Sequence, residues 1–234
     1  MAVAAQLLIR QAVELLQDQT SIRWSVPDLV RWLNSGQREI LMHRPDIYNK
    51  TATVQCVVGT KQSLPTDGVK LIDVQRNDAT SKRAVRMCNR EILDSQIPGW
   101  HSLTAKDEVV HFMYDPREPK AFWVYPPATA AAALMVNYSA TPTDLIIPAD
   151  GSDYSAVTGN VSVPDQNANS LLDFILYRAY MKDSEYAGDP QRSQAYYTLF
   201  ANALGIDIKG TVAVGPTSRG NPNTRPGGAP AAGA

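Results

Sequence analysis

The sequence has few of the residues that build disulfide scaffolds, metal centres and thiol active sites. Its 234 residues include two cysteines, Cys56 and Cys88, and three histidines. The cysteines form no CxxC pair, and the histidines form no HxH or HExxH pattern. A disulfide-rich fold and a cysteine-based zinc site are therefore excluded. We expect two unpaired thiols, with one disulfide between them as the alternative, and no bound metal.

An excess of one charge and long apolar runs are also missing. The chain has 22 Lys and Arg against 23 Asp and Glu, a net charge of −1, which excludes a generally basic nucleic-acid binder but not a local patch. The apolar start of the chain is interrupted by Arg10 and Glu14, and no run approaches the ~20 residues of a membrane span. We therefore expect a soluble, unsecreted protein with no membrane partner. Its hydrophobic fraction of 44% suffices for a packed core.

Residues 1–49 carry the apolar spacing of two helices. In the first, apolar residues recur on one face: Leu8, Ala12, Leu15 and Leu16. Ser25 is the expected N-cap of the second helix, and the residue before Pro45 should end it. The apolar face of this helix consists of Leu29, Trp32, Leu33, Ile40 and Leu41, with Gln37 expected off that face.

Residues 50–147 predict a β-rich insertion. Alternating and β-branched segments indicate strands at 51–58, 69–75, 83–87, 109–114, 121–125 and 134–138. Residues 59–63 and 64–68 are expected as turns, and Pro126 and Pro127 as the break after one strand. Asn89 should cap a short helix that extends to about residue 96.

Polar residues dominate the next segment, 148–164, which we predict as an exposed loop. Helices return over 165–208, where the apolar residues of the first one are spread too widely for a surface helix. The predicted fold class is α+β. An antiparallel helical bundle formed by the N- and C-terminal helices (1–49 and 165–208) carries the β-rich insertion and an extended C-terminal arm.

That arm, residues 209–234, has six Gly, four Pro, no aromatic residue and no acid. It cannot bury enough apolar surface to offset the entropy of ordering, so we expect it to be flexible in isolation and to order on a partner. Because its three charges are positive, the remainder of the chain carries 19 basic and 23 acidic residues, about −4. The candidate binding residues of the arm are Lys209, Val212, Val214, Arg219 and Arg225.

A search for catalytic motifs finds no GxGxxG, no GxxxxGK[ST] and no GxSxG. His111, Asp115 and Ser102 could be drawn into a hydrolytic arrangement, but a strand histidine before an Asp-Pro turn explains them better. We therefore predict no catalytic residue and no cofactor. The aromatic residues could stack on single-stranded nucleic acid, but basic residues do not alternate with them, which favours a hydrophobic sheet face. They include Trp100, Tyr114, Phe122, Trp123, Tyr125 and Tyr138.

Four passages together carry a resemblance to a known family. They are residues 26–40 (VPDLVRWLNSGQREI), 62–74 (QSLPTDG leading into LIDV), 122–127 (FWVYPP, followed by ATP at 140–142) and 186–190 (YAGDP). In this order, within a helix–β–helix frame that spans about residues 1–205, the sequence resembles the head-to-tail adaptor (connector) proteins of tailed bacteriophages. This group includes the tail-tubular-A-like and head-completion adaptors.

The resemblance implies a structural virion protein with no enzymatic activity. Such adaptors form rings, usually of twelve subunits, that join the portal to a tail nozzle or tail completion protein and extend the DNA channel without sequence-specific DNA binding. The arm would bind the portal, and assembly would take place in the bacterial host cytoplasm. Two other readings remain open: an uncharacterised hydrolase with its site in the β-rich domain, or a monomeric adaptor for a host protein or nucleic acid.

Overall fold

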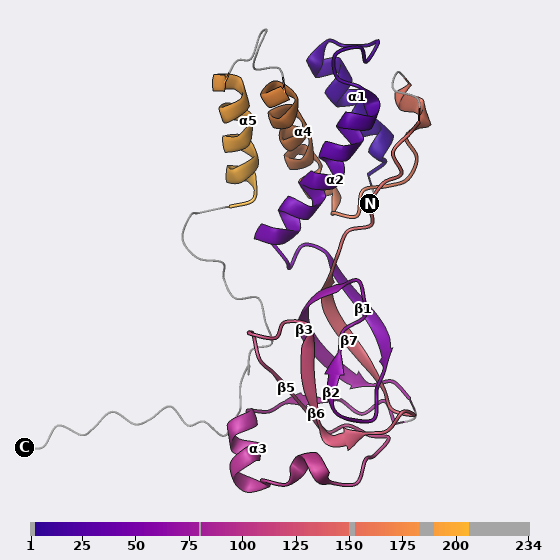
Figure 1. Cartoon of the computed structure of the whole chain (residues 1–234), viewed down its shortest axis with the longest axis vertical. Coiled ribbons are helices and arrows are strands. Elements are labelled where there is room, and N and C mark those ends of the chain that lie inside the picture. Colours follow the sequence, from indigo (N-terminus) through magenta and orange to yellow (C-terminus); the bar gives the residue numbers. More distant parts are fainter. Residues whose placement is uncertain (1–2, 80, 150–152, 183–189, 206–234) are drawn as a thin grey trace, which may run out of the picture. The chain divides into compact units, whose positions relative to one another are not determined.

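The computed structural model describes residues 3–79, 81–149, 153–182 and 190–205 and has the mixed α+β composition predicted (Figure 1). It divides into two compact units. The helical unit comprises the described residues of Met1–Lys50, Asp67–Val69 and Ser139–Val214, and the β-rich unit comprises Thr51–Thr66 and the described residues of Lys70–Tyr138. Residues 139–147, which the sequence assigned to the β-rich insertion, thus fall in the helical unit.

Four helices form the helical unit, and a fifth belongs to the β-rich unit. Helix α4 contacts α1, α2 and α5, and it lies between α1 and α5 in Figure 1. One hydrophobic cluster draws buried side chains from all four helices. The central place of α4 explains its wide apolar surface. The helices are α1 (Ala5–Leu16), α2 (Val26–His43), α3 (Arg90–Gln96), α4 (Ala168–Lys182) and α5 (Pro190–Ala203).

The predicted start of α2 is confirmed. The Ser25 hydroxyl accepts a hydrogen bond from the backbone N–H of Asp28 at 3.4 Å, as an N-cap should. Asp28 in turn accepts hydrogen bonds from Lys182 at 2.7 Å and from Arg31 at 2.9 Å. The hydrogen bond from Lys182 lowers the pKa of the Asp28 carboxyl, helped by Ser25 and Arg31 and opposed by burial. Asp28 therefore ties the start of α2 to the end of α4.

A carboxylate also organises the turn between α1 and α2. Asp18 accepts hydrogen bonds from the backbone N–H groups of Ile22, Arg23 and Trp24 at 3.2, 2.8 and 2.9 Å. Burial raises the pKa of this carboxyl, but the three backbone donors outweigh it and the pKa lies below its usual range. Trp24 then donates its indole N–H to the carbonyl of Ala179 at 3.1 Å, which fixes the turn against α4.

Close packing between α2 and α4 depends on a glycine. A Cβ at Gly36 would meet the ring of Phe174 at 2.9 Å and a methyl group of Leu171 at 3.2 Å. Both neighbours are buried in the core, so neither can move away freely. Gly36 therefore allows an approach of the two helices that any larger residue would oppose.

Two predicted faces are corrected by the structure. Leu15 is 52% exposed, because α1 turns Val13 inward and buries a face that also contains Leu8, Ala12 and Leu16. Gln37, expected off the apolar face of α2, is fully buried. Its side-chain oxygen accepts a hydrogen bond from the backbone N–H of Ser162 at 2.7 Å. The polar side chain is buried because a chain segment without regular structure crosses α2 at this point.

That segment, residues 141–164, is termed the connecting segment; it joins the last strand to the region before α4. The expectation of a fully exposed loop at 148–164 is wrong for three valines. Val157, Val161 and Val163 are buried in the hydrophobic cluster of the helices. The segment also bonds to the start of α1, since Ala5 N–H donates to the Gly159 carbonyl at 3.0 Å. Apolar residues among many polar ones thus anchor it.

Two sheets form the strand-containing part of the chain. The orders are β1-β7-β3 and β2-β6-β5-β4. In the second sheet β5 pairs antiparallel with β6, with His111 opposite Tyr125, and parallel with β4. The strands are β1 (Asn49–Gln55), β2 (Gly59–Ser63), β3 (Gly68–Asn77), β4 (Arg86–Met87), β5 (His111–Tyr114), β6 (Ala121–Ala128) and β7 (Ala133–Ala140).

Two of the expected turns are strand instead. Residues 59–63 form β2, which pairs with β6 over Lys61–Trp123, Gln62–Phe122 and Ser63–Ala121. Gln62 is the only buried residue of this edge strand, so the strand needs no apolar side chains. Its sequence therefore lacks the alternation of apolar and polar residues that would predict a strand. Pro126 and Pro127 do not end β6, which continues to Ala128. Their missing N–H groups are tolerated because both prolines lie beyond the β5–β6 pairing, which ends at Tyr125, and within the register shift of the β2–β6 pairing between Gly59 and Lys61. The Pro127 carbonyl still accepts a hydrogen bond from Lys106 N–H at 2.7 Å.

The core of the β-rich unit is aromatic, with a buried amide beside it. Its largest fully buried residues are Trp100, Phe112, Phe122 and Tyr138. Asn77, 1% exposed, donates to the carbonyls of Arg83 and Val109 and accepts from Val109 N–H at 2.8 Å. The predicted cap of α3 is confirmed, since Asn89 accepts from Glu91 N–H.

Both cysteines are free, as expected. Cys56 is buried, and burial raises its pKa to about 11, so its thiol stays protonated at neutral pH. Cys88 is half-buried, and burial raises its pKa as well.

Replacing Asn34 by Ala should lower the free energy of unfolding by about 2 kcal/mol, because the backbone N–H and carbonyl of Leu145 would lose their buried partner. Urea unfolding followed by circular dichroism at 222 nm measures this. Asn202→Ala is the matched control, since Asn202 is exposed on α5 and the intrinsic helix propensity changes equally. Equal effects of both substitutions would contradict the role assigned to Asn34.

Stability should fall as the pH drops below about 5, because Asp18 and Asp28 have pKa values below those of the unfolded chain. Their stabilisation is complete above the unfolded pKa of about 4 and is lost as the pH falls through the folded values. Asp28→Asn should remove part of this dependence and cost about 0.5–1 kcal/mol at pH 7. Urea unfolding from pH 7 to pH 3 measures both effects. A slope identical to that of the parent chain would contradict the assignment.

Candidate functional site

The candidate binding residues of the C-terminal arm lie outside the described residues. Lys209, Val212, Val214, Arg219 and Arg225 all belong to this group, so their assignment as a partner-binding segment stays a prediction. The described part of the chain provides the other candidates: a possible hydrolytic set, an aromatic cluster, a hollow in the β-rich unit, and the exposed apolar side chains.

The hydrolytic arrangement is not assembled among the described residues. Asp115 accepts a hydrogen bond from the backbone N–H of Arg117 at 2.9 Å, as the first residue of a turn does. The His111 ring stacks on Tyr125, with centroids 6.3 Å apart, and its Nδ1 is buried without a partner. No hydrogen bond joins His111 to Asp115 or Ser102 within the part of the chain that the structure covers. His111 is therefore explained as a strand residue and Asp115 as a turn residue, while Ser102 ends the short 3-10 helix Trp100–Ser102.

No cluster of three or more metal-binding side chains occurs in the described ranges. No described helix is long and apolar enough to cross a membrane.

The aromatic cluster is part of the core, as the preference for a hydrophobic sheet face predicted. Trp100 and Phe122 are fully buried, and Trp123 is 9% exposed. Sequence reasoning missed the cations that flank Trp123: the Arg90 guanidinium lies 5.1 Å and the Lys61 ammonium 5.5 Å from the ring centroid. They come from α3 and β2, so spacing along the chain could not place them there. Since Trp123 is covered, these contacts stabilise the unit and offer no stacking surface for bases.

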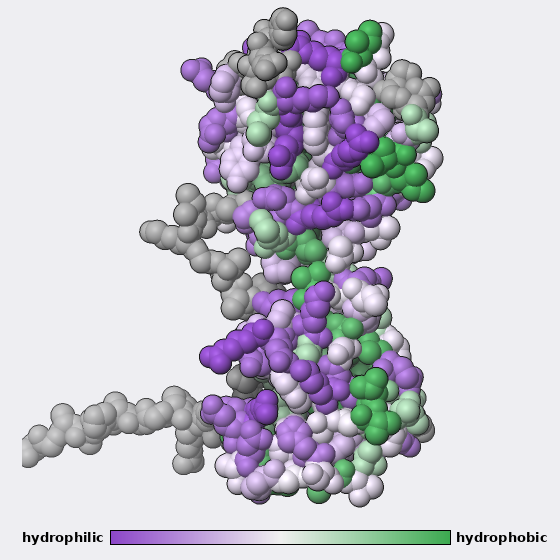
Figure 2. Space-filling view, in the orientation of Figure 1, coloured by the Kyte–Doolittle hydropathy of each residue, from purple (hydrophilic) through white to green (hydrophobic). Residues whose placement is uncertain are grey.

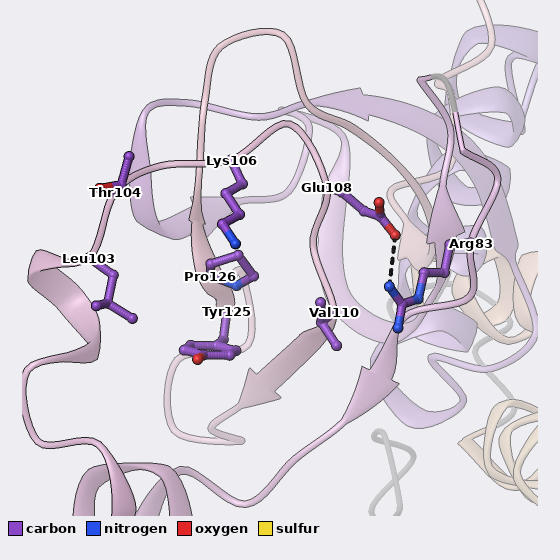
Figure 3. A pocket seen from close by; sticks show the side chains of 8 residues that line it. All are labelled: Arg83, Leu103, Thr104, Lys106, Glu108, Val110, Tyr125 and Pro126. Carbon is purple, nitrogen blue, oxygen red and sulfur yellow. Dashed lines mark hydrogen bonds and ion pairs between the residues drawn. The ribbon is translucent and has the colours of Figure 1, made fainter.

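A hollow of about 520 Å³ lies in the β-rich unit (Figure 3). An ion pair between Arg83 and Glu108, 3.2 Å apart, lines one side, and Tyr125 and Pro126 line another. The Lys106 side chain points toward Pro126 in the same view. The lining combines an ion-paired guanidinium, one ammonium group and an apolar wall. No lining residue has a hydroxyl or thiol that is hydrogen-bonded to a base.

Exposed apolar side chains occur in both units, as the green areas of Figure 2 show. In the helical unit Ile146 is 78% exposed and Leu199 of α5 is 53% exposed. Around Leu199, the outer face of α5 forms an open hollow of about 660 Å³. The remaining exposed apolar residues are Leu7, Leu15, Ile22, Met42, Ile147 and Met181 in the helical unit, and Val57, Val58, Ile92 and Leu103 in the β-rich unit.

The connecting segment is held by polar side chains of α2 that sequence reasoning did not single out. Asn34 donates to the Leu145 carbonyl at 3.1 Å and accepts from the Leu145 N–H at 2.9 Å. Arg38 forms an ion pair with Asp144, and Gln37 binds Ser162. These residues hold the backbone that presents Ile146 to solvent. The available signal was a pair of amides three residues apart, Asn34 and Gln37, placed among the buried apolar residues of α2.

A comparison with curated proteins finds no match for the chain. A family model described as "SU10 adaptor protein" matches residues 4–226 and thus almost the whole sequence, including both units. This family consists of bacteriophage structural adaptors, in agreement with the resemblance found in the sequence. Exposed apolar side chains such as Ile146 and Leu199 are typical of surfaces that bind other proteins. The chain belongs to the SU10 adaptor protein family.

Proposed function

We propose that this chain is one subunit of a ring of twelve copies at the junction between the head and tail of a bacteriophage. The ring joins the portal to a tail nozzle or tail completion protein and lengthens the channel for the genomic DNA. The observation that carries the proposal is the family match over residues 4–226.

The helical unit supports a role in ring assembly. Its helices share one rigid core, in which Gly36 permits close packing of α2 on α4. We assign the four helices to an antiparallel bundle that packs side by side with its copies around the ring, while the β-rich unit faces outward or toward the tail. A rigid body with preformed contact surfaces loses little entropy on assembly.

Residues 209–234 form the portal-binding arm in this proposal. The support is compositional: the segment is rich in Gly and Pro, lacks acidic residues and carries Lys209, Arg219 and Arg225. Such a segment can wrap an acidic groove on the portal and order as it binds.

The charge of the remaining chain suits a channel wall. Residues 1–208 carry 19 basic and 23 acidic side chains, a net charge of about −4, and twelve copies multiply this value. A wall of the same sign as the DNA phosphates allows the genome to slide without sequence-specific binding. The proposal includes no enzymatic step, and the chain would act as a virion component assembled in the host cytoplasm.

Imaging tests the proposed function. The full-length chain, mixed with the portal protein of the same phage, should appear in negative-stain electron micrographs as rings stacked on portal rings. The portal is included because subunits of this type can remain monomeric until it is present. A chain that stays monomeric with portal would overturn the proposal.

Deletion of residues 209–234 should reduce the amount of chain that cosediments with portal by at least about tenfold, since most binding energy at such contacts comes from a few residues. The circular dichroism melt of the truncated chain should match that of the parent.

Replacing Lys209, Arg219 and Arg225 by Gln should weaken portal binding and its dependence on salt. Replacing three exposed cations of the β-rich unit is the matched control: Arg86, Arg117 and Lys120. Undiminished binding of the truncated chain to portal would contradict the assignment of residues 209–234 as the portal-binding arm.

A further inference from the structure

One edge of the sheet β1-β7-β3 is open among the described residues. Strand β1 has β7 as its neighbour on one side and no described strand on the other (Figure 1). At one end of the pair, the Tyr48 carbonyl accepts a hydrogen bond from Ala140 N–H at 3.1 Å. At the other end, the Ala132 carbonyl accepts one from Cys56 N–H at 2.9 Å. These bonds are eight residues apart on both strands, so β1 and β7 pair antiparallel without a bulge.

Alternate residues of β1 turn their backbone groups away from β7. In an antiparallel pair, residues in hydrogen-bonded positions direct both backbone groups toward the partner strand, and the residues between them direct theirs outward. Because Tyr48 and Cys56 bond to β7, the outward groups belong to the odd-numbered residues. Within the described part of the chain, no other residue hydrogen-bonds to these outward groups. They form a template on which another strand can pair. The residues are Asn49, Thr51, Thr53 and Gln55.

The other sheet edges in the described chain are covered, short or charged. The outer side of β3 bonds to the segment before β4, since Val85 N–H donates to the Gln75 carbonyl at 3.2 Å. Strand β4 consists of two residues, and β2 carries Lys61, which forms an ion pair with Glu118. Short edges and edge lysines protect sheets from strand addition. In β1, by contrast, residues 51–55 (TATVQ) contain no charge and no proline.

The two faces of β1 differ in polarity. The register with β7 places Val54 opposite Leu134 and therefore on the same face. Ala52 lies opposite Val136 on that face as well. The two β7 residues are fully buried, whereas Ala52 and Val54 are only half-buried. The apolar face thus extends to the open edge, where its last residues are incompletely covered. The odd-numbered residues of β1 form the other face, which is polar and exposed.

A segment with the matching pattern follows the last described residue, Gly205. In residues 206–214 (IDIKGTVAV), termed the alternating segment, every even position is apolar or glycine, and every odd position except Ala213 is polar. Strict alternation predicts a strand with one apolar and one polar face, and the Gly-Pro pair at 215–216 is a typical boundary. An extended strand of this length spans about 30 Å, the width of a small domain, which is enough to reach an adjacent subunit.

We propose that the alternating segment of one subunit adds as a strand to the open β1 edge of the next subunit in the ring. Its backbone pairs with the outward groups of β1, its even-numbered residues extend the apolar face, and its odd-numbered residues extend the polar face. The inference rests on the proposed function and names one contact between the subunits. Because the contact joins two different parts of the chain, its repetition around an axis closes a ring.

The source of the added strand is a second copy of this chain. The C-terminal arm, which contains most of the alternating segment, is expected to order only on a partner. In a closed ring each subunit gives one segment and receives another, so neither an open edge nor an unpaired segment remains. Exchange of an identical element between copies is a low-cost route to oligomers. The arm beyond Val214, including Arg219 and Arg225, stays available for the portal.

Cross-linking of full-length chains bound to portal tests the contact. In a Cys88→Ser background, where the remaining Cys56 is buried, one variant carries Thr53→Cys and a second carries Thr211→Cys. Both positions belong to the polar face of the extended sheet, so a short bismaleimide should join the two variants when they are mixed. A chain with both substitutions should yield a ladder of covalent oligomers up to the full ring. Thr104→Cys, also exposed in the β-rich unit, is the matched control for Thr53→Cys and should give no product.

Electron microscopy of the same samples separates the possible failures. Three outcomes would overturn the contact and leave the proposed function standing: rings without a link between positions 53 and 211, a link from position 211 to portal, or a link confined within single chains of the doubly substituted variant. Absence of rings on portal would overturn both.

Val212→Asp supplies an independent measurement, with Ala213→Asp as its matched control. The two substitutions add the same charge at neighbouring positions, but only position 212 belongs to the apolar face of the alternating segment. Val212→Asp should lower the yield of the 53–211 link per portal-bound chain by at least about tenfold, and Ala213→Asp should leave it within about twofold of the parent. Counting per portal-bound chain removes any effect on portal binding from the comparison. Equal yields for the two variants would contradict the strand addition.

Discussion

The structure depends on buried side-chain amides that satisfy backbone groups where no helix or strand can. Asn34 pairs with both the N–H and the carbonyl of Leu145, Gln37 accepts from Ser162, and Asn77 serves Val109 in the same two-way manner. An unpaired backbone group in these places would cost about as much as a lost buried hydrogen bond. The amides let irregular segments cross a core, and so they place residues such as Ile146 at the surface.

Local rules predicted the regular parts of the chain. Ser25 and Asn89 cap helices because their short polar side chains reach backbone N–H groups a few residues ahead, an effect contained in the adjacent sequence. The rest depended on distant partners. Gln37 became a core residue through Ser162, and β2 became a strand through β6, although its own residues are nearly all polar. Neither partner is visible from the periodicity of the segment itself.

The same division applies to the candidate site. The sequence indicated a protein without catalytic residues and carried the family resemblance, since both depend on motifs that can be read along the chain. It did not indicate the exposure of Ile146 and Ile147 or the open hollow on the outer face of α5. Ile146 and Ile147 resemble any short apolar segment until their exposure is known. Apolar residues become interaction candidates only when the fold leaves them uncovered.

The hydrogen bonds between Asn34 and Leu145 join residues 111 positions apart. An even longer stretch of chain separates the helices α2 and α4, which pack against each other. During translation at about 5–20 residues per second, the N-terminal helices must wait roughly 5–20 s for the segment that covers them. The β-rich unit, continuous apart from one short excursion, can complete its own contacts in that interval. The helical unit therefore cannot complete its core until α4 and α5 have been synthesised. Premature association of nascent chains is thereby disfavoured by topology alone.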